Sequence, residues 1–289
     1  MSSVSDAIDG STRARDAFVR ACELDVTVRK PGNVSVASPG HRMRAEQFID
    51  SAAAAAPPLF ERGAAVGVRI EQAVAATLAA VGCNTNLGIV LLIAPLAAAA
   101  ERRGALQSAA ALRDALEAVL AGLDTADAAA AYRAIRQANP GGLGSAREAD
   151  VHSAPQIGLR DAMALAAPRD LIARQYANAF ADVFDALRRD VPSGFALGRA
   201  GASDVQRVFL GWLSRHPDSH IVRKHGEAVA HSVMSAAQGW VAHPAPDRAP
   251  AFAAWDEALK ARGVNPGTSA DLTVATLWIA GVLPPWHGS

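Results

Sequence analysis

The sequence predicts an all-α fold, with residues 1–289 forming a single globular domain whose ligand site is built from the loops between helices. Almost every segment with regularly spaced apolar residues has the period of an α-helix. Runs of alternating β-branched and aromatic residues are absent, and the VTV stretch at residues 26–28 is too short to start a sheet. The chain also lacks an internal repeat and a Gly/Ser-rich or Pro-rich linker long enough to divide it.

The spacing of the apolar residues predicts the helices one by one. In chain order they are Thr12–Val28, Ala45–Ala56, Gly67–Val81, Gly88–Ala100, Leu106–Leu120, Ala126–Ala138, Gly158–Ala166, Arg169–Arg189, Asp204–Ser214, His220–Val241, Pro250–Arg262 and Ala270–Ala280. The KPGN motif at residues 30–33 ends the first helix, and Pro57-Pro58 ends the second, because proline lacks the N–H that a helix interior needs. Asp218-Ser219 and Ser269 are typical helix-start residues.

The composition excludes several classes of protein. With 28 basic and 28 acidic side chains the formal charge is zero, so a nucleic-acid partner is not expected. Cys22 and Cys83 lie in no CxxC or Cys/His cluster, which favours a reducing, cytoplasmic setting. The N-terminus lacks the apolar core of a secretory signal. The longest apolar run, residues 88–100, is shorter than the roughly 20 residues that span a bilayer, so we expect a buried helix and no membrane partner.

Five loops between the predicted helices combine glycine with residues that bind phosphate, ribose or metal ions. Glycine lets backbone N–H groups approach a ligand closely. The loops are RKPGNVSVASPGHRM (29–43), GCNTNLG (82–88), NPGGLGSAREADVH (139–152), HPDSHIVRKHG (216–226) and NPGTSADLT (265–273). Their combination is more informative than any one loop.

The first two loops each have a structural and a functional interpretation. KPGN is a helix stop, and Lys30 is also a candidate phosphate contact because a flexible ammonium suits phosphate oxygens. Asn84, Thr85 and Asn86 precede the most apolar helix, where they form a plausible cap. Two amides beside a helix N-terminus also suit an anion or a nucleotide edge, because that end offers unpaired N–H groups.

The remaining loops carry most of the charged candidates. PGGLG is a weak signal without the lysine and serine of a P-loop, but Glu148 and Asp150 follow it and are the ligand type that magnesium prefers. The histidines of HPDSHIVRKHG match no closed zinc site. In the last loop, Ser269 is expected to cap the final helix. That cap places Asp271 in the first turn, a position favourable for a carboxylate without any function.

Taken in order, these motifs resemble the triphosphoribosyl-dephospho-coenzyme A synthase family. The motifs are KPGN, a GH pair, NTNLGI with LLIAPLA, AIRQANPGGLG with a downstream DV, DAMALAAPRDLIARQYA, DSHIVRKHG and NPGTSADL, and they cover residues from about 20 to 282. The resemblance implies an all-helical enzyme that transfers the ribose 5-triphosphate of ATP to the 2′-hydroxyl of dephospho-coenzyme A and releases adenine.

The chain departs from that family at three motifs. Where members read NTHKG it has Asn86 and Leu87 in place of histidine and lysine, and its GH pair is not followed by the usual aspartate. Of the GARGEA motif only Gly144 and Glu148-Ala149 remain. The acceptor is therefore open between dephospho-coenzyme A and a pterin-type alcohol, because the NTNLGI form resembles a branch found with tetrahydromethanopterin-dependent enzymes. The oligomeric state, including a homodimer, is open as well.

Displacing adenine from C1′ requires groups that hold the triphosphate, help adenine leave and accept a proton from the attacking hydroxyl. We expect Glu148, Asp150 and Asp271 to hold Mg²⁺, and one of these carboxylates or His41 to act as the base. The expected nucleotide contacts are Lys30, Asn33, Asn84, Thr85, Asn86, Gly141, Gly142, Gly144, Asp218, Arg223 and Lys224. A nucleotide-binding assembly protein without catalysis and a nucleoside-phosphate hydrolase are the rival functions.

Overall fold

The computed structural model describes residues 2–41, 43–140 and 150–285. Over these residues the regular structure is helical, apart from two isolated bridges in the loop after the first helix. The α-helices are α1 (Ser2–Thr27), α2 (Ala45–Leu59), α3 (Val66–Val81), α4 (Leu87–Ala100), α5 (Ala109–Ala121), α6 (Thr125–Ala138), α7 (Leu159–Ala166), α8 (Leu171–Ala177), α9 (Ala181–Asp190), α10 (Ala202–Leu213), α11 (Ser219–His225), α12 (Glu227–Gln238), α13 (Pro250–Ala261) and α14 (Gly267–Val282). Three short 3₁₀ turns are η1 (Ala105–Gln107), η2 (Leu197–Arg199) and η3 (Pro246–Arg248). The predicted all-α fold class is confirmed.

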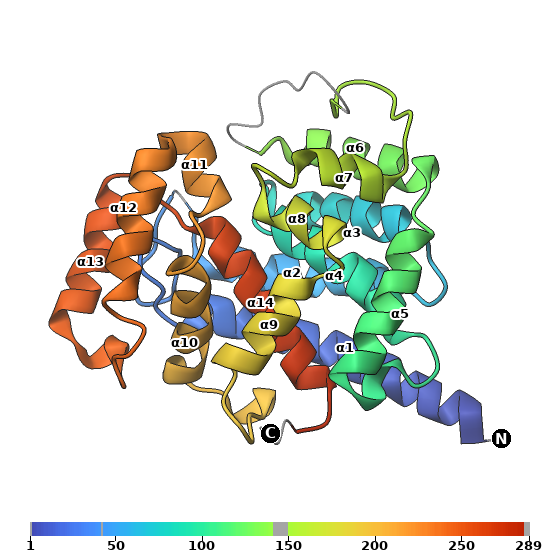
Figure 1. Cartoon of the computed structure of the whole chain (residues 1–289), viewed down its shortest axis with the longest axis horizontal. Coiled ribbons are helices and arrows are strands. Elements are labelled where there is room, and N and C mark those ends of the chain that lie inside the picture. The colour runs from blue at the N-terminus through green and yellow to red at the C-terminus, as the bar shows by residue number, and fades with distance from the viewer. Residues whose placement is uncertain (1, 42, 141–149, 286–289) are drawn as a thin grey trace.

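Two helices, α4 and α14, form the centre of the molecule. Figure 1 shows α14 running through the middle, and it contacts α1, α4, α9 and α10. Both helices are apolar around most of their circumference, as expected for helices that are covered on all sides. None of the described helices is long and apolar enough to cross a membrane.

The described core has two parts. The main hydrophobic cluster joins residues from α1 to α10 with α14, whereas a smaller cluster lies among α10, α11, α12 and α13. Figure 1 shows these last helices side by side at one end of the molecule, next to α14. Helix α10 belongs to both clusters, because Val208 faces the main one and Phe209 the smaller one. The loops between the two clusters are therefore packed against helices of both clusters.

Two of the predicted long helices are each two helices. The segment 169–189 breaks after α8, where Ala179 and Phe180 adopt positive φ angles of 54° and 57°. The segment 220–241 breaks at Gly226, whose φ is 84°, an angle that glycine adopts without steric cost. Apolar periodicity continues across both breaks, so the spacing alone did not reveal them.

The predicted end of the second helix at Pro57-Pro58 is also wrong, because α2 continues to Leu59. The two prolines lack N–H groups that would bond to the carbonyls of Ala53 and Ala54. Ala53 is exposed and Ala54 is half-buried, so water can solvate those carbonyls. Leu59 is fully buried in the core, and this burial favours the extra turn.

The last helix begins earlier than predicted. It starts at Gly267, so Ser269 is inside the helix and is not its cap. Asp271 consequently lies in the second turn, where the favourable interaction with the helix N-terminus no longer accounts for a carboxylate. Its position therefore needs another explanation.

Candidate active site

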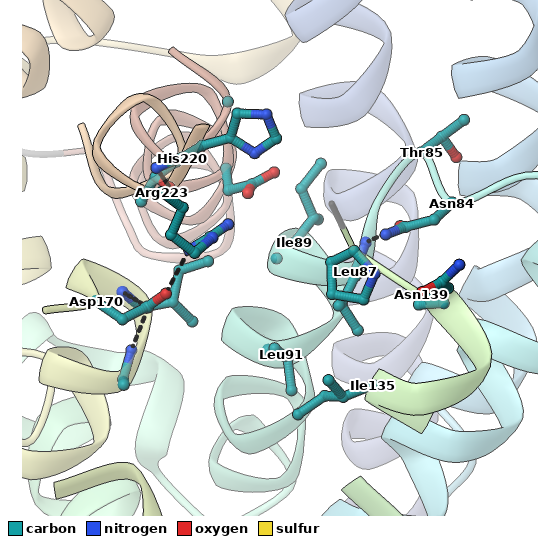
Figure 2. Close-up of a pocket in the computed structure, with 18 of the residues that line it drawn as sticks. Asn84, Thr85, Leu87, Ile89, Leu91, Ile135, Asn139, Asp170, His220 and Arg223 are labelled. Carbon is teal, nitrogen blue, oxygen red and sulfur yellow. Dashed lines mark hydrogen bonds and ion pairs between the residues drawn. The ribbon is translucent and has the colours of Figure 1, made fainter. Parts of the chain in front are cut away.

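A cavity of about 910 Å³ lies among α4, α6, α8, α11 and α14, with the loop after α1 on one side. This volume is at the upper end of the range of roughly 300–1,000 Å³ that is common for small-molecule sites. Figure 2 shows charged side chains, including Asp170 and Arg223, facing apolar side chains from α4 and α6 across it.

The cavity brings together most of the described candidates from the sequence. Those that line it are Asn33, His41, Asn84, Thr85, Asp150, Arg223, Lys224 and Asp271. Three other candidates, Lys30, Asn86 and Asp218, do not line it. Gly141, Gly142, Gly144 and Glu148 lie outside the described residues.

Lys30 is a buried structural lysine. Its ammonium lies 3.1 Å from a carboxylate oxygen of Asp25, donates to Asn33 Oδ1 at 2.9 Å and also donates to the Asp25 carbonyl. The side chain is fully buried and lies 5.9 Å from the ring centroid of Phe209. The structure thus places Lys30, an expected phosphate contact, inside the protein and not at the cavity.

Asp218 has a structural role of the same kind. One carboxylate oxygen accepts from the backbone N–H groups of His220 and Ile221, and the other accepts from the N–H and hydroxyl of Ser269. The carboxylate thus caps α11 and ties it to α14. The carboxylate is fully buried and accepts four hydrogen bonds, so the structure places Asp218, an expected nucleotide contact, away from the cavity surface.

The three residues of the NTN motif have different positions, and only two of them line the cavity. Asn84 Oδ1 accepts from the Leu87 N–H and so caps α4. Thr85 lines the cavity but donates its hydroxyl hydrogen to Ser51 at 2.6 Å. Asn86 points away from the cavity, where its Oδ1 accepts from Thr77 of α3. The structure thus places Asn86, an expected nucleotide contact, away from the cavity.

Asp271 is a carboxyl on α14 that faces the cavity. It lies directly over Gly88 of α4, where a Cβ atom would come within 2.0 Å of Asp271 Oδ2. Among the described residues none donates a hydrogen bond to it. Burial raises the pKa of Asp271 well above its ordinary value, and the nearby Asp25 and Asp218 raise it further. A cavity-facing carboxyl without a protein partner is suited to bind a ligand.

Two histidines line the same end of the cavity. His220 is in the first turn of α11, and its buried Nε2 has no hydrogen-bond partner among the described residues. Burial lowers the pKa of His220 to about 3, and Lys224 and Arg223 contribute to that shift. His41 is likewise shifted, because burial lowers its pKa although the Gly32 carbonyl opposes the change. Both imidazoles are therefore neutral at pH 7.

His41 has an unusual backbone and a defined tautomer. Its φ is 55°, a left-handed conformation that non-glycine residues rarely adopt. Its Nε2 lies 2.7 Å from the Gly32 carbonyl oxygen, which can only accept a hydrogen bond. A neutral His41 must therefore carry its hydrogen on Nε2, which leaves the lone pair on Nδ1 available.

The basic side chains of the cavity come from α11 and from the residue before the α8 cap. Arg223 donates to Asp170 Oδ2 at 2.8 Å, and Asp170 Oδ1 caps α8. Lys224 and Arg169 also line the cavity, and no acidic partner of either is found among the described residues. Four aspartates line the same cavity, so it is the two cations without an acidic partner, Lys224 and Arg169, that suit an anionic ligand.

Sequence reasoning missed several residues that line the cavity, among them Asp25, Asp170 and His220. Asp25 did carry a signal, because a charged residue on the apolar stripe of α1 with Ala21 and Val28 is unusual. His220 stood in a motif whose histidines were considered only as zinc ligands. Within the described part of the chain no three acidic, histidine or cysteine side chains form a metal-binding group.

Comparisons with known proteins show the family of this chain. Residues 11–288 match the profile of the family described as ATP:dephospho-CoA triphosphoribosyl transferase. A solved structure from Archaeoglobus fulgidus, assigned as a triphosphoribosyl-dephospho-CoA synthase, has a similar fold with a TM-score of 0.63 and 22% sequence identity. That similarity covers 80% of this chain and 96% of the other. A comparison with curated proteins finds no match. Because the family profile spans nearly the whole sequence, this chain is an enzyme that belongs to the ATP:dephospho-CoA triphosphoribosyl transferase family.

Proposed function

We propose that this chain moves the triphosphoribosyl group of ATP onto the hydroxyl of dephospho-CoA and releases adenine in the cavity described above. The family supports the reaction, and one structural observation supports its location. Cations without acidic partners, neutral histidines and the unpaired Asp271 carboxyl all face one cavity. The phosphates of an anionic nucleotide supply the negative charge that these cations lack as a partner.

The triphosphate binds at the α11 end of the cavity in this proposal. Lys224 and Arg223 lie in the last turn of α11, and both line the cavity. Arg223 is oriented by its bond to Asp170, so its remaining N–H groups can contact phosphate oxygens. Arg169 adds a third positive charge. The buried Asp218 indirectly supports this end, because it anchors the short helix that carries two of the cations.

Asp271 is the residue that we propose to hold a magnesium ion together with the phosphates. Magnesium is often bound by one or two carboxylates, with substrate phosphates and water as the other ligands. The structure fits that pattern, because Asp271 has no partner among the described residues. Asp150 also lines the cavity and is a second candidate ligand, while Glu148 lies outside the described residues. The ion would neutralise phosphate charge.

His41 is the base that we propose for the acceptor hydroxyl. In the reaction the C1′–N9 bond of ATP breaks and its electron pair leaves with adenine, which takes up a proton from water. A bond from C1′ to the acceptor oxygen forms, and the hydroxyl proton leaves. The free Nδ1 of His41 accepts that proton, while its Nε2–H stays bonded to the Gly32 carbonyl. The left-handed backbone of His41 fits such a role, because strained backbone often occurs at functional sites.

The Asp271→Asn variant tests this proposal. Asparagine has nearly the same shape, and the native carboxyl makes no hydrogen bond to the described residues, so we expect an unchanged melting temperature. We also expect adenine release to fall at least about a hundredfold, because an amide is a poor magnesium ligand. Chromatography of free adenine from ATP, magnesium and dephospho-CoA measures the activity.

The same assay separates the rival functions. Adenine that forms without an acceptor would indicate a hydrolase, and bound ATP without any adenine would indicate a binding protein. Normal adenine release by the Asp271→Asn variant would remove the proposed magnesium ligand. Each of these results contradicts a different part of the proposal.

A pterin-type alcohol is the second acceptor that we propose to test. The observation in its favour is Leu87, which lines the cavity where the family motif quoted above has a lysine. An apolar side chain at that position changes the surface offered to the acceptor, whereas Asn86 is buried and offers it nothing. Mass spectrometry of the product formed with each alcohol distinguishes the two acceptors.

A further inference from the structure

The end of the cavity opposite α11 is formed by a continuous apolar surface, which we name the apolar wall. Its members are Leu87, Leu91, Ile135 and Met163. Figure 2 shows Leu87, Leu91 and Ile135 on the side away from His220 and Arg223. Leu91, Ile135 and Met163 keep 7–9% of their surface exposed. The proposed roles in phosphate binding and proton transfer make no use of this wall.

One polar side chain lies at the edge of the apolar wall. Asn139 follows α6 and lines the cavity near Leu87, as Figure 2 shows. Its φ of 43° is the left-handed conformation of a common helix stop, which explains why the position takes asparagine or glycine. The side chain is exposed and its amide makes no hydrogen bond within the described part of the chain, so it is available to a ligand in the cavity.

A flat ring with hydrogen-bonding groups on one edge matches this combination. An apolar surface stabilises the ring by excluding water from it, but it cannot distinguish one ring from another. A side-chain amide can, because asparagine donates to N7 of adenine and accepts from its 6-amino group in a bidentate pair. Adenine is also what the proposed reaction must hold, since both ATP and dephospho-CoA carry it.

We propose that the apolar wall is a binding subsite for an adenine ring and that the Asn139 amide reads the N6/N7 edge of that ring. The inference rests on the proposed function for the identity of the two nucleotides. It assigns the base to one end of the cavity and the triphosphate to the α11 end. Asn139 is thereby a specificity-determining residue, and Ile135 contributes to affinity without specificity.

Equilibrium binding of ATP and 7-deaza-ATP tests the role of Asn139. In 7-deaza-ATP a C–H group replaces N7, so one of the two hydrogen bonds cannot form. We expect the wild-type protein to bind ATP about tenfold more tightly than 7-deaza-ATP. The Asn139→Gly variant should bind both about equally, and glycine preserves the left-handed helix stop. Asn139→Asp should likewise lose the preference for ATP, because it keeps the shape of the side chain but cannot donate to N7.

The Ile135→Ala variant tests the apolar wall separately. It should weaken ATP and 7-deaza-ATP by the same severalfold factor, because the wall contacts the faces of the ring. Binding of dephospho-CoA without ATP shows whether the ring belongs to the donor or to the acceptor. A loss confined to dephospho-CoA in both variants assigns the subsite to the acceptor's adenine, and a loss confined to ATP assigns it to the donor's.

Unchanged binding of both nucleotides in both variants would overturn the inference. Failure of the proposed function gives a different result, because the binding assay needs no turnover. A wild-type protein that distinguishes ATP from 7-deaza-ATP but releases no adenine would keep the subsite and lose the reaction. Normal adenine release with no effect of either variant on binding would keep the reaction and exclude the subsite.

Discussion

At the scale of single residues, Gly88 determines where the Asp271 carboxyl can lie. A Cβ atom at position 88 would be 2.0 Å from Asp271 Oδ2 and 2.8 Å from a methyl carbon of Ile172. Real Cβ atoms do not come this close to a neighbour, so a larger residue must displace the carboxyl. The NTNLG motif therefore needs glycine at position 88 because the Asp271 carboxyl lies directly against it. The backbone angles that glycine allows are not the reason.

The Gly88→Ala variant should separate stability from activity. Alanine in a helix is favoured over glycine by about 0.5–1 kcal/mol, which offsets part of the clash. We expect adenine release to fall at least about tenfold because Asp271 moves, and a modest change in the melting temperature. Gly10→Ala in α1 is the control, since nothing lies within 4 Å of its Cβ position. Full activity in Gly88→Ala would show that the position of Asp271 is unimportant.

Lys30 should affect stability more than nucleotide binding. Replacing it with alanine leaves the Asp25 carboxylate buried without its ion-pair partner, which costs about 3–5 kcal/mol of unfolding free energy. Urea unfolding measures this loss. The double variant Asp25→Asn with Lys30→Met should recover part of it, because no uncompensated charge remains. A stable Lys30→Ala protein that binds ATP weakly would restore Lys30 as a phosphate contact.

At the scale of helices, the junction of α11 and α14 organises the cationic end of the cavity. Asp218 joins the two helices with the four hydrogen bonds described above. Helix α11 has seven residues, too few to be stable alone, so its position depends on this junction. Arg223 and Lys224 reach the cavity from its last turn.

The Asp218→Asn variant should loosen α11. The amide NH₂ group of asparagine would replace one carboxylate oxygen and face hydrogen-bond donors instead of accepting from them. We therefore expect a loss of about 2 kcal/mol of unfolding free energy. The Michaelis constant for ATP should rise, because Arg223 and Lys224 become less well placed. Asp124→Asn is the matched control, since Asp124 caps only its own helix, α6. An equal effect of the two variants on the Michaelis constant would contradict this role of the junction.

The sequence predicted most helices because apolar periodicity is a local property, but it predicted their breaks poorly. The break at Phe180 is stabilised by contacts with other helices, since the ring is fully buried and packs against Tyr176 at 5.9 Å. Its left-handed backbone is unfavourable in isolation. Likewise, α2 continues through two prolines because Leu59 is buried by neighbouring elements.

At the scale of the whole molecule, the half-buried His216 makes stability depend on pH. Burial lowers the pKa of His216, Asp182 opposes that shift, and Arg174 and Arg215 add to it. Below pH 6.5 the unfolded chain then binds more protons at this position than the folded protein does. The contribution of His216 to the free energy of unfolding consequently falls as the pH drops from 7.5 to 5.5.

The His216→Asn variant isolates this effect. We expect its unfolding free energy to fall less between pH 7.5 and 5.5 than that of the wild type, as measured by urea unfolding at both values. The comparison is needed because Asp25, Asp218 and Asp271 act in the opposite direction, since burial raises their pKa values. An identical pH dependence in variant and wild type would exclude a contribution from His216.

By itself, the sequence determined the all-α class, most of the helices and the loops that carry the polar chemistry, because helical periodicity and turn residues act over a few neighbouring positions. Only the tertiary structure decided which polar side chains face the cavity. Lys30, Asn86 and Asp218 turn inward because each finds a buried partner. The partner of Lys30 is Asp25, that of Asn86 is Thr77 of α3, and that of Asp218 is Ser269 of α14. Asp271 and His220 face the cavity without such partners. The direction of a loop side chain depends on what packs against it from distant segments, and short-range patterns do not contain that information.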